Sequence, residues 1–434
     1  LKSLKYNLNL CKFYERRYSK MDIEQNRLKA ALIRKCRIEQ NWKQEAFAKS
    51  LPLASSSFSE MERGLRPIPE DLFVKMCNKL QIQESTDNFI ESIQNQLLTV
   101  KKNLYMCKYD EACFLLSKLN DDKDRINKSI LFLEYNLTQF ICNVTCNNNY
   151  DKYLSLITEY YDCLDILQKY QFVLYKGIAE KSKHNPKAAI KLFSNLLNQP
   201  YQIQYFSELL YYHAAICYIH IGHLALAHNL NKKAETLFQN EQNINRLAFT
   251  MMHEAIIYSQ ENQIDEAEKI YKKLLDSYSK YLPDQIVNTI LCNAGYNFVK
   301  ANLFYKAIDI YSKLKPNWQQ IPQIFYGIAW TLLQTDQENE LNKFLQYSRK
   351  YPKDKFIDDM LEIIDLQRKP NSEKKIETKL KTCEKYLIQE GSSEVMIFVY
   401  EQLIQYYETR SIVKQVKYLK KLNELNKRGM QYEQ

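Results

Sequence analysis

The chain has 434 residues, of which 45% are hydrophobic and 26% are charged; it is too long for one ordinary core, and we expect two or more folded units. Its seven glycines are spread widely, which excludes glycine-rich phosphate loops and the G-x-S-x-G nucleophile motif. Few glycines beside 33 tyrosines and 19 phenylalanines predict an all-helical protein, because sheets and their turns usually contain more glycine.

The net charge of +10 is concentrated near the N-terminus. Residues 1–82 contain 17 Lys or Arg and nine Asp or Glu, whereas the other 352 residues contain 44 and 42. This asymmetry is typical of a small nucleic-acid-binding module on a neutral body, because neutralised phosphates supply most non-specific affinity. We interpret residues 1–20 as a basic extension, either poorly ordered or upstream of a native start at Met21.

Residues 27–82 predict a compact unit of four or five short helices. One helix is expected to end at Gly64, because glycine adopts the left-handed cap most easily and Pro67 prevents continuation. We place the domain boundary at residue 85. The expected helices cover residues 28–36, a segment that ends at Pro52, residues 55–63 and residues 71–80.

Two stretches of this unit resemble the lambda-repressor (Xre) type of helix-turn-helix domain: RIEQNWKQEAFA at 37–48 and FSEMERG at 58–64. In that family the third helix enters the DNA major groove, and the start of the second helix holds a phosphate. The resemblance implies that Arg37 and Glu62 form an internal ion pair and that the domain binds double-stranded DNA. Ala54 replaces the usual serine cap, although Ser55 could cap a helix that starts one residue later.

The reading helix also carries Glu60 and has no Arg or Lys before Arg63, so it lacks the commonest guanine contact. One alternative is therefore a domain kept only for packing or dimerisation. The resemblance places Gln44 at the DNA backbone and the serines at base edges. The candidate DNA-binding residues are Gln44, Ser55, Ser56, Ser57 and Ser59, with Lys43, Lys49, Arg63 and Arg66 as phosphate contacts.

Residues 86–434 predict a succession of helix pairs. Small residues recur twelve positions apart in four successive units, which start 38, 40 and 40 residues from one another. Two antiparallel helices need a small residue on each where they cross, because larger side chains would hold their axes apart. An aromatic residue follows the second small position by four residues in three of the units. The small pairs are Gly177/Ala189, Ala215/Ala227, Ala255/Ala267 and Gly295/Ala307.

This pattern resembles the tetratricopeptide repeat, most closely in NAGY at 293–296 and KAIDIY at 306–311. The resemblance implies a right-handed superhelix with a concave groove, because each pair buries its face only by stacking on its neighbours. The position two before each first small residue often faces that groove in the resembled repeat, although these side chains could instead be buried between helices. The candidate peptide-binding residues are Asn293, Tyr175, His213 and His253, with Tyr212, His220 and Gln260 as second-line candidates.

No residue constellation predicts catalysis, a cofactor or a metal ion. His220, His223 and His228 straddle a helix turn without the cysteine or paired carboxylates that would complete a ligand set. The eleven cysteines form no C-x-x-C pair, and we interpret them as free core thiols. No apolar run is long enough to span a membrane, so we expect a cytoplasmic protein.

The combination of the two domains resembles the cytoplasmic peptide-pheromone receptors of Gram-positive bacteria, the Rap, Rgg, NprR, PlcR and PrgX group. The resemblance implies a homodimeric, quorum-sensing transcriptional regulator without catalytic activity. A short signalling peptide in the groove of residues 86–434 would control its binding to a DNA operator. The alternative from a different class is a scaffold, or a response-regulator-binding protein, in which the helix-turn-helix is vestigial.

Overall fold

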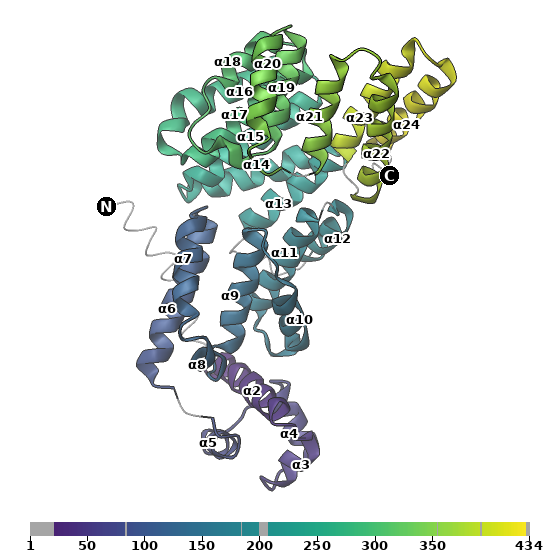
Figure 1. The fold of residues 1–434 in the computed structure, drawn as a ribbon. Helices are drawn as coiled ribbons and strands as arrows, with labels where there is room; N and C mark the ends of the chain where they lie inside the picture. The colour runs from purple at the N-terminus through teal and green to yellow at the C-terminus, as the bar shows by residue number, and fades with distance from the viewer. Residues whose placement is uncertain are drawn as a thin grey trace. The chain divides into compact units, whose positions relative to one another are not determined.

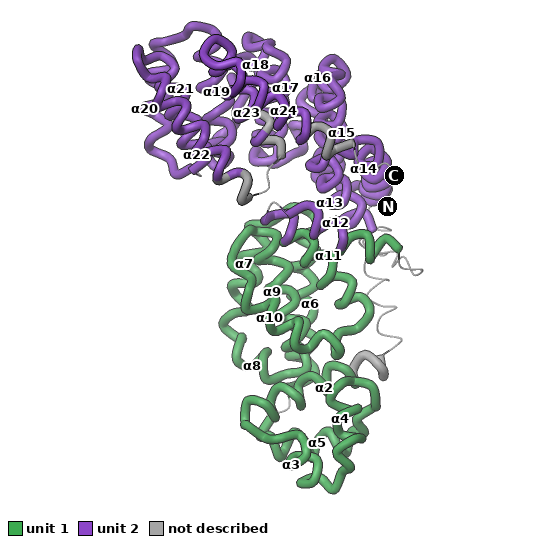
Figure 2. The backbone as a smooth tube through the Cα atoms, turned by 90° about the vertical axis from the view of Figure 1, so that its right-hand side faces the viewer, with its two compact units in different colours: residues 1–179, 192–203 green, residues 180–191, 204–434 purple. Residues whose placement is uncertain are grey.

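The computed structural model describes residues 21–82, 85–183, 185–198, 207–353, 355–390 and 393–430, and all regular structure in these ranges is helical (Figure 1). The prediction of an all-helical protein is therefore confirmed. The predicted extension at residues 1–20 lies outside the described ranges. The chain forms two compact units: unit 1 holds residues 1–179 and 192–203, and unit 2 holds residues 180–191 and 204–434 (Figure 2).

Eleven helical elements are described between residues 21 and 182. They are α2 (Met21–Glu39), α3 (Gln44–Lys49), α4 (Ser55–Glu62), α5 (Glu70–Lys79), α6 (Asp87–Tyr105), α7 (Tyr109–Leu119), α8 (Lys123–Asn127), α9 (Phe132–Thr145), α10 (Asp151–Glu159), the short 3-10 helix η1 (Tyr161–Cys163) and α11 (Ile166–Ser182).

The remaining elements continue from α12, which like α11 contains a boundary between the two units. They are α12 (Pro186–Leu197), α13 (Ser207–His220), α14 (Leu224–Asn240), α15 (Ile244–Gln260), α16 (Ile264–Lys273), η2 (Leu274–Tyr278), η3 (Ser279–Tyr281), α17 (Asp284–Lys300), α18 (Phe304–Tyr311), η4 (Trp318–Gln320), α19 (Gln323–Gln334), α20 (Glu338–Ser348), α21 (Lys355–Gln367), α22 (Glu373–Glu390), α23 (Ser393–Glu408) and α24 (Ile412–Met430).

The helices α2 to α5 close around a small aromatic core. Phe47 and Phe58 are fully buried with ring centroids 5.3 Å apart, and Trp42 meets Phe47 edge-on. Helix α4 ends just before Gly64, which has a φ of 68°, so the predicted left-handed cap is confirmed. The N-cap of α4 is Ala54, which has no side-chain hydrogen bond to offer, so Ser55 does not serve as the cap.

Asparagine takes the left-handed position after many of the other helices. Asn41, Asn147, Asn262 and Asn302 all have φ between 55° and 64° directly after a helical segment. Asparagine tolerates this conformation better than other residues with a Cβ, because its short amide can hydrogen-bond locally. A chain with seven glycines can therefore still end many helices sharply.

The small residues predicted at helix crossings lie where the helices meet. The paired alanines are fully buried. A Cβ added to Gly177 would lie 2.3 Å from the Phe193 ring, and one added to Gly295 would lie 2.4 Å from the Tyr311 ring. Each glycine thus admits the aromatic residue that follows the second small position, which confirms the predicted register.

Asn231 occupies that aromatic position in one unit and builds a polar junction instead. Its side-chain amide is fully buried and donates to the Thr250 carbonyl at 2.9 Å and to Glu254 at 3.3 Å. Glu254 also pairs with His228 Nδ1 at 2.9 Å. The junction between α14 and α15 is therefore held by hydrogen bonds rather than by a ring.

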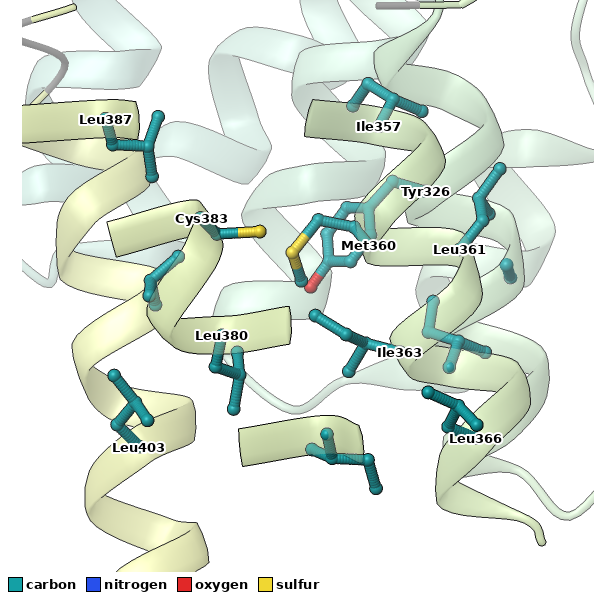
Figure 3. Close-up of a cluster of buried hydrophobic side chains, with 14 of the residues drawn as sticks. Tyr326, Ile357, Met360, Leu361, Ile363, Leu366, Leu380, Cys383, Leu387 and Leu403 are labelled. Carbon is teal, nitrogen blue, oxygen red and sulfur yellow. The ribbon is translucent and has the colours of Figure 1, made fainter. Parts of the chain in front are cut away.

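Consecutive helices of unit 2 form stacked pairs. Helices α13 and α14, α15 and α16, and α17 and α18 pack together, and α15, α17, α19 and α21 pack in succession. Figure 3 shows the apolar interior farther along the chain, where Met360 and Ile363 of α21 lie near Leu380 and Cys383 of α22. Among the described helices none is both long enough and apolar enough to cross a membrane.

Candidate functional site

An ion pair inside unit 1 joins the last turn of α2 to the end of α4. Arg37 donates to Glu62 through two nitrogens, at 2.6 Å and 3.1 Å, and both side chains are buried. Arg37 also donates to the Trp42 carbonyl. This arrangement confirms the internal ion pair predicted between Arg37 and Glu62.

Gln44 takes part in the same network. Its Nε2 donates to Glu62 Oε2 at 2.7 Å, and the side chain is half-buried at the first position of α3. The amide is thereby held in one orientation at a helix N-terminus, where backbone N–H groups favour an anion.

Helix α4 turns its apolar residues inward and its serines outward. Phe58, Met61 and Glu62 are buried. Ser56 and Glu60 are exposed, whereas Ser55, Ser57 and Ser59 are half-buried. The predicted reading helix therefore presents small hydroxyl side chains at the protein surface, together with one acidic side chain.

The predicted phosphate contacts are exposed around these two helices. Lys43 precedes α3 and Lys49 lies in its last turn, while Arg63 and Arg66 follow α4. Arg66 donates to Ser57 Oγ at 2.9 Å, so one cation lies beside the serine face. None of the nine candidate DNA-binding residues is buried.

A second group of predicted residues meets on α13 and α15 of unit 2. The Tyr212 ring stacks on His253 with centroids 4.9 Å apart and meets His213 edge-on at 4.8 Å. Their exposed fractions are 6%, 7% and 9%. Two residues from one repeat and one from the next therefore form a single aromatic cluster.

One nitrogen of each imidazole in this cluster is unsatisfied. The Nδ1 atoms of His213 and His253 are buried and form no hydrogen bond with any residue that the structure describes. Burial, followed by the charge of Lys181, lowers the pKa of His213 well below its ordinary value and that of His253 to about 3. Both rings are therefore neutral at physiological pH, with one donor and one acceptor nitrogen each.

Two cations that the sequence analysis missed lie beside these rings. Arg246 is 5.6 Å from the Tyr212 ring centroid, and its charge also lowers the pKa of His213. Burial and then the charge of Arg246 lower the pKa of Lys181, and no ion pair to Lys181 occurs among the described residues. Arg246 precedes His253 by seven residues, or two helical turns, so the sequence could have predicted that the two side chains share one face of α15. No comparable signal marked Lys181.

The other predicted peptide-binding residues are distributed around this cluster or away from it. Asn293 on α17 is half-buried; its Nδ2 donates to the Thr289 carbonyl one turn earlier at 2.9 Å and lies 3.4 Å from Met252 Sδ. His220, half-buried at the end of α13, acts electrostatically on His253. Gln260 is half-buried at the end of α15, and Tyr175, with 8% exposed, belongs to unit 1.

No protein-family model matches the sequence, and no curated protein matches it. The fold is similar to that of several solved structures. A Rap protein complexed with competence and sporulation factor has a TM-score of 0.63 and 14% identity over 79% of this chain and 99% of that one. NprR in complex with its cognate peptide NprX has a TM-score of 0.57 and 15% identity over 79% and 99%. Aspartyl phosphate phosphatase F from Bacillus subtilis has a TM-score of 0.52 and 15% identity over 80% and 97%.

These likenesses establish a shared fold, because identities this low do not carry activity with them. The expected likeness to the Rap and NprR group is therefore confirmed for the helical architecture. The identity of α2 to α5 as a DNA-binding domain, and the residues that contact peptide or DNA, remain predictions.

Proposed function

We propose that this chain is a DNA-binding transcriptional regulator, without catalytic activity, that is controlled by a short peptide bound at the His213–His253 cluster. The observation that carries the proposal is the pair of buried Nδ1 atoms, which have no hydrogen-bond partner among the residues with a described structure. Such an atom costs about 1–3 kcal/mol, which a ligand that supplies the missing hydrogen bond recovers. An extended peptide has an N–H and a C=O at every residue and can serve both rings.

The charges around the cluster indicate which peptides would bind best. Lys181 has no ion pair among the described residues, and Arg246 lies 5.6 Å from the centroid of the Tyr212 ring. A carboxylate placed beside Lys181 would remove an uncompensated charge from a partly desolvated position. The preferred peptide therefore carries a carboxylate, either an acidic side chain or its free C-terminus.

The fold likeness to NprR, a structure that contains its cognate peptide, supports a peptide as ligand. The exposed Ser56, the half-buried serines beside it on α4 and the four exposed cations support DNA as the second partner. In a homodimer, the peptide would change the separation of the two α4 helices and hence the half-site spacing that they fit. This requires a peptide that binds one arrangement more tightly than the other.

One observation favours a second candidate function, a scaffold that grips a protein partner such as a response regulator. Glu60 is exposed on α4, and no Arg or Lys lies within that helix. A carboxylate on the reading face repels phosphates, so the helix-turn-helix could be vestigial. A partner captured equally well by the wild type and by a Gln44→Ala/Ser56→Ala variant would support this alternative.

The peptide is tested with a positional-scanning library of short peptides, made with free and with amidated C-termini. Thermal shift of the full chain reports binding, and footprinting on DNA that flanks its own gene reports the response. We expect acidic peptides to bind, and to change the footprint of the wild type. Absence of any footprint at moderate salt, with or without peptide, would overturn the DNA-binding proposal.

A further inference from the structure

Three thiols of unit 1 converge from two packed helices. Cys142 and Cys146 are four positions apart, so they share one face at the C-terminal end of α9. Cys113 projects from α7, which packs against α9. Its Sγ lies 3.8 Å from Cys142 Sγ and 3.4 Å from Cys146 Sγ, and all three sulfur atoms lie within 4.8 Å of one another.

These separations match those of thiolates that share one metal ion. A Zn–S bond is about 2.3 Å long, so two sulfurs on one ion are about 3.8–4.0 Å apart at tetrahedral or trigonal angles. The 3.8 Å separation already has this value, and the 3.4 Å separation needs a change of a few tenths of an ångström. Both separations are far from the roughly 2.05 Å of a disulfide bond.

The surroundings also suit a cation. The Asp110 carboxylate, one helical turn before Cys113, acts electrostatically on both Cys113 and Cys146. Cys142 is buried, whereas Cys113 and Cys146 are half-buried, so two of the three thiols are partly accessible to solvent.

We propose that Cys113, Cys142 and Cys146 form a site for one thiophilic d10 cation, Zn²⁺ or Cu⁺, held by three thiolates. Soft thiolate ligands select such ions. Zn²⁺ would add a water or carboxylate oxygen as fourth ligand, whereas Cu⁺ would be satisfied by three sulfurs. The ion would clamp α7 to the end of α9, so its binding would stabilise unit 1.

The site is tested on the full chain, purified under reducing conditions and loaded separately with Zn²⁺ and with Cu⁺. Bound metal per chain is measured by mass spectrometry after dialysis, and affinity by competition with a chromophoric chelator. The variants Cys113→Ser and Cys146→Ser each remove one half-buried ligand. Cys292→Ser is the matched control, because it removes a half-buried thiol of unit 2.

We expect one ion per wild-type chain and per Cys292→Ser chain, and an affinity lower by at least about tenfold in the two ligand variants. The ion should raise the unfolding temperature of the wild type and of Cys292→Ser but not of Cys146→Ser. Circular dichroism of the metal-free variants shows whether they fold. Retention of neither ion, or equal affinity in Cys146→Ser and wild type, would overturn the proposal.

Discussion

Buried polar groups are treated in opposite ways in the two compact units. In unit 1, Arg37, Glu62 and Gln44 satisfy one another through several charge-assisted hydrogen bonds. In unit 2, His213 and His253 are also buried, yet their Nδ1 atoms have no partner in the described part of the chain. The first arrangement pairs its own polar groups, whereas the second leaves two hydrogen-bonding atoms that the proposed peptide would pair.

This difference separates polar residues that maintain a fold from polar residues that can bind. A paired buried network such as the Arg37–Glu62 ion pair favours one conformation of the fold. An unpaired network lowers stability by the desolvation of its groups, and a ligand that pairs with them recovers that free energy. The comparison therefore predicts opposite consequences for substitutions in the two units.

The largest effect is expected for Glu62→Ala. Removal of one partner of a buried ion pair leaves Arg37 without its counter-charge, which costs about 3–5 kcal/mol of unfolding free energy. Denaturant unfolding followed by circular dichroism measures the loss. Glu60→Ala, an exposed carboxylate two residues away, is the control and should stay within about 0.5 kcal/mol of wild type. Equal stability of the two variants would contradict a structural role for the pair.

The second effect is a loss of stability in acid that comes from unit 2. His213 and His253 have depressed pKa values in the folded chain, so the unfolded chain binds more protons below pH 6.5. Their stabilising contribution is complete above pH 6.5 and is lost as the pH falls toward the folded pKa, which is about 3 for His253. From pH 7 to pH 5, one such histidine costs about 2 kcal/mol.

The variant His253→Gln isolates this effect, because glutamine is neutral at both pH values. The difference in unfolding free energy between pH 7 and pH 5 should be smaller in the variant than in wild type by about 2 kcal/mol. An unchanged difference would show that His253 titrates in the folded chain near its ordinary pKa.

The fold was largely predictable, because its rules are local and periodic. The register of small residues placed the crossings at Gly177 and Gly295 correctly, since a Cβ at either position would clash with the ring of Phe193 or Tyr311. The Asn231 junction was visible only as an exception to the pattern. The asparagines with left-handed backbone conformation also mark helix ends, and a search for glycine alone does not find these ends.

The candidate sites were less predictable, because they depend on contacts between distant residues. His213 and His253 occupy the same position in successive repeats, so the repeat length predicts that they lie close together. Lys181 belongs to another helix, and the later units have Ile219, Ser259 and Val299 at the matching position, so no repeated lysine marked it. Cys113 is 29 residues from Cys142, and only the packing of α7 on α9 brings the two thiols together.

The third effect is a gain of stability at the expense of binding. His253→Phe replaces an imidazole that has an unpaired atom with an apolar ring of similar shape, so stability should be equal or higher by about 1 kcal/mol. Affinity for peptides selected from the library should fall at least about tenfold, since the cost of one lost hydrogen bond is about 1.5 kcal/mol. Thermal melts and calorimetric titrations measure the two quantities.

His228→Phe is the matched histidine control for that experiment. His228 Nδ1 already has a partner in Glu254, at 2.9 Å, and its side chain is 40% exposed. Its replacement should lower stability by no more than about 1 kcal/mol and leave peptide affinity unchanged. Loss of peptide affinity in His228→Phe, with no loss in His253→Phe, would show that the peptide does not bind at the His213–His253 cluster.

The smallest effect on stability is expected for the exposed cations of unit 1, which should act on DNA instead. Lys49→Ala removes an exposed charge from α3, and its unfolding free energy should stay within about 0.5 kcal/mol of wild type. If Lys49 neutralises one phosphate, the slope of log affinity against log salt for duplex DNA becomes shallower by about 0.9. Lys269→Ala, an exposed lysine of unit 2, should leave that slope unchanged. Identical slopes for both variants and wild type would show that Lys49 does not contact DNA. The distinction between paired and available polar groups would then apply only to the peptide site of unit 2.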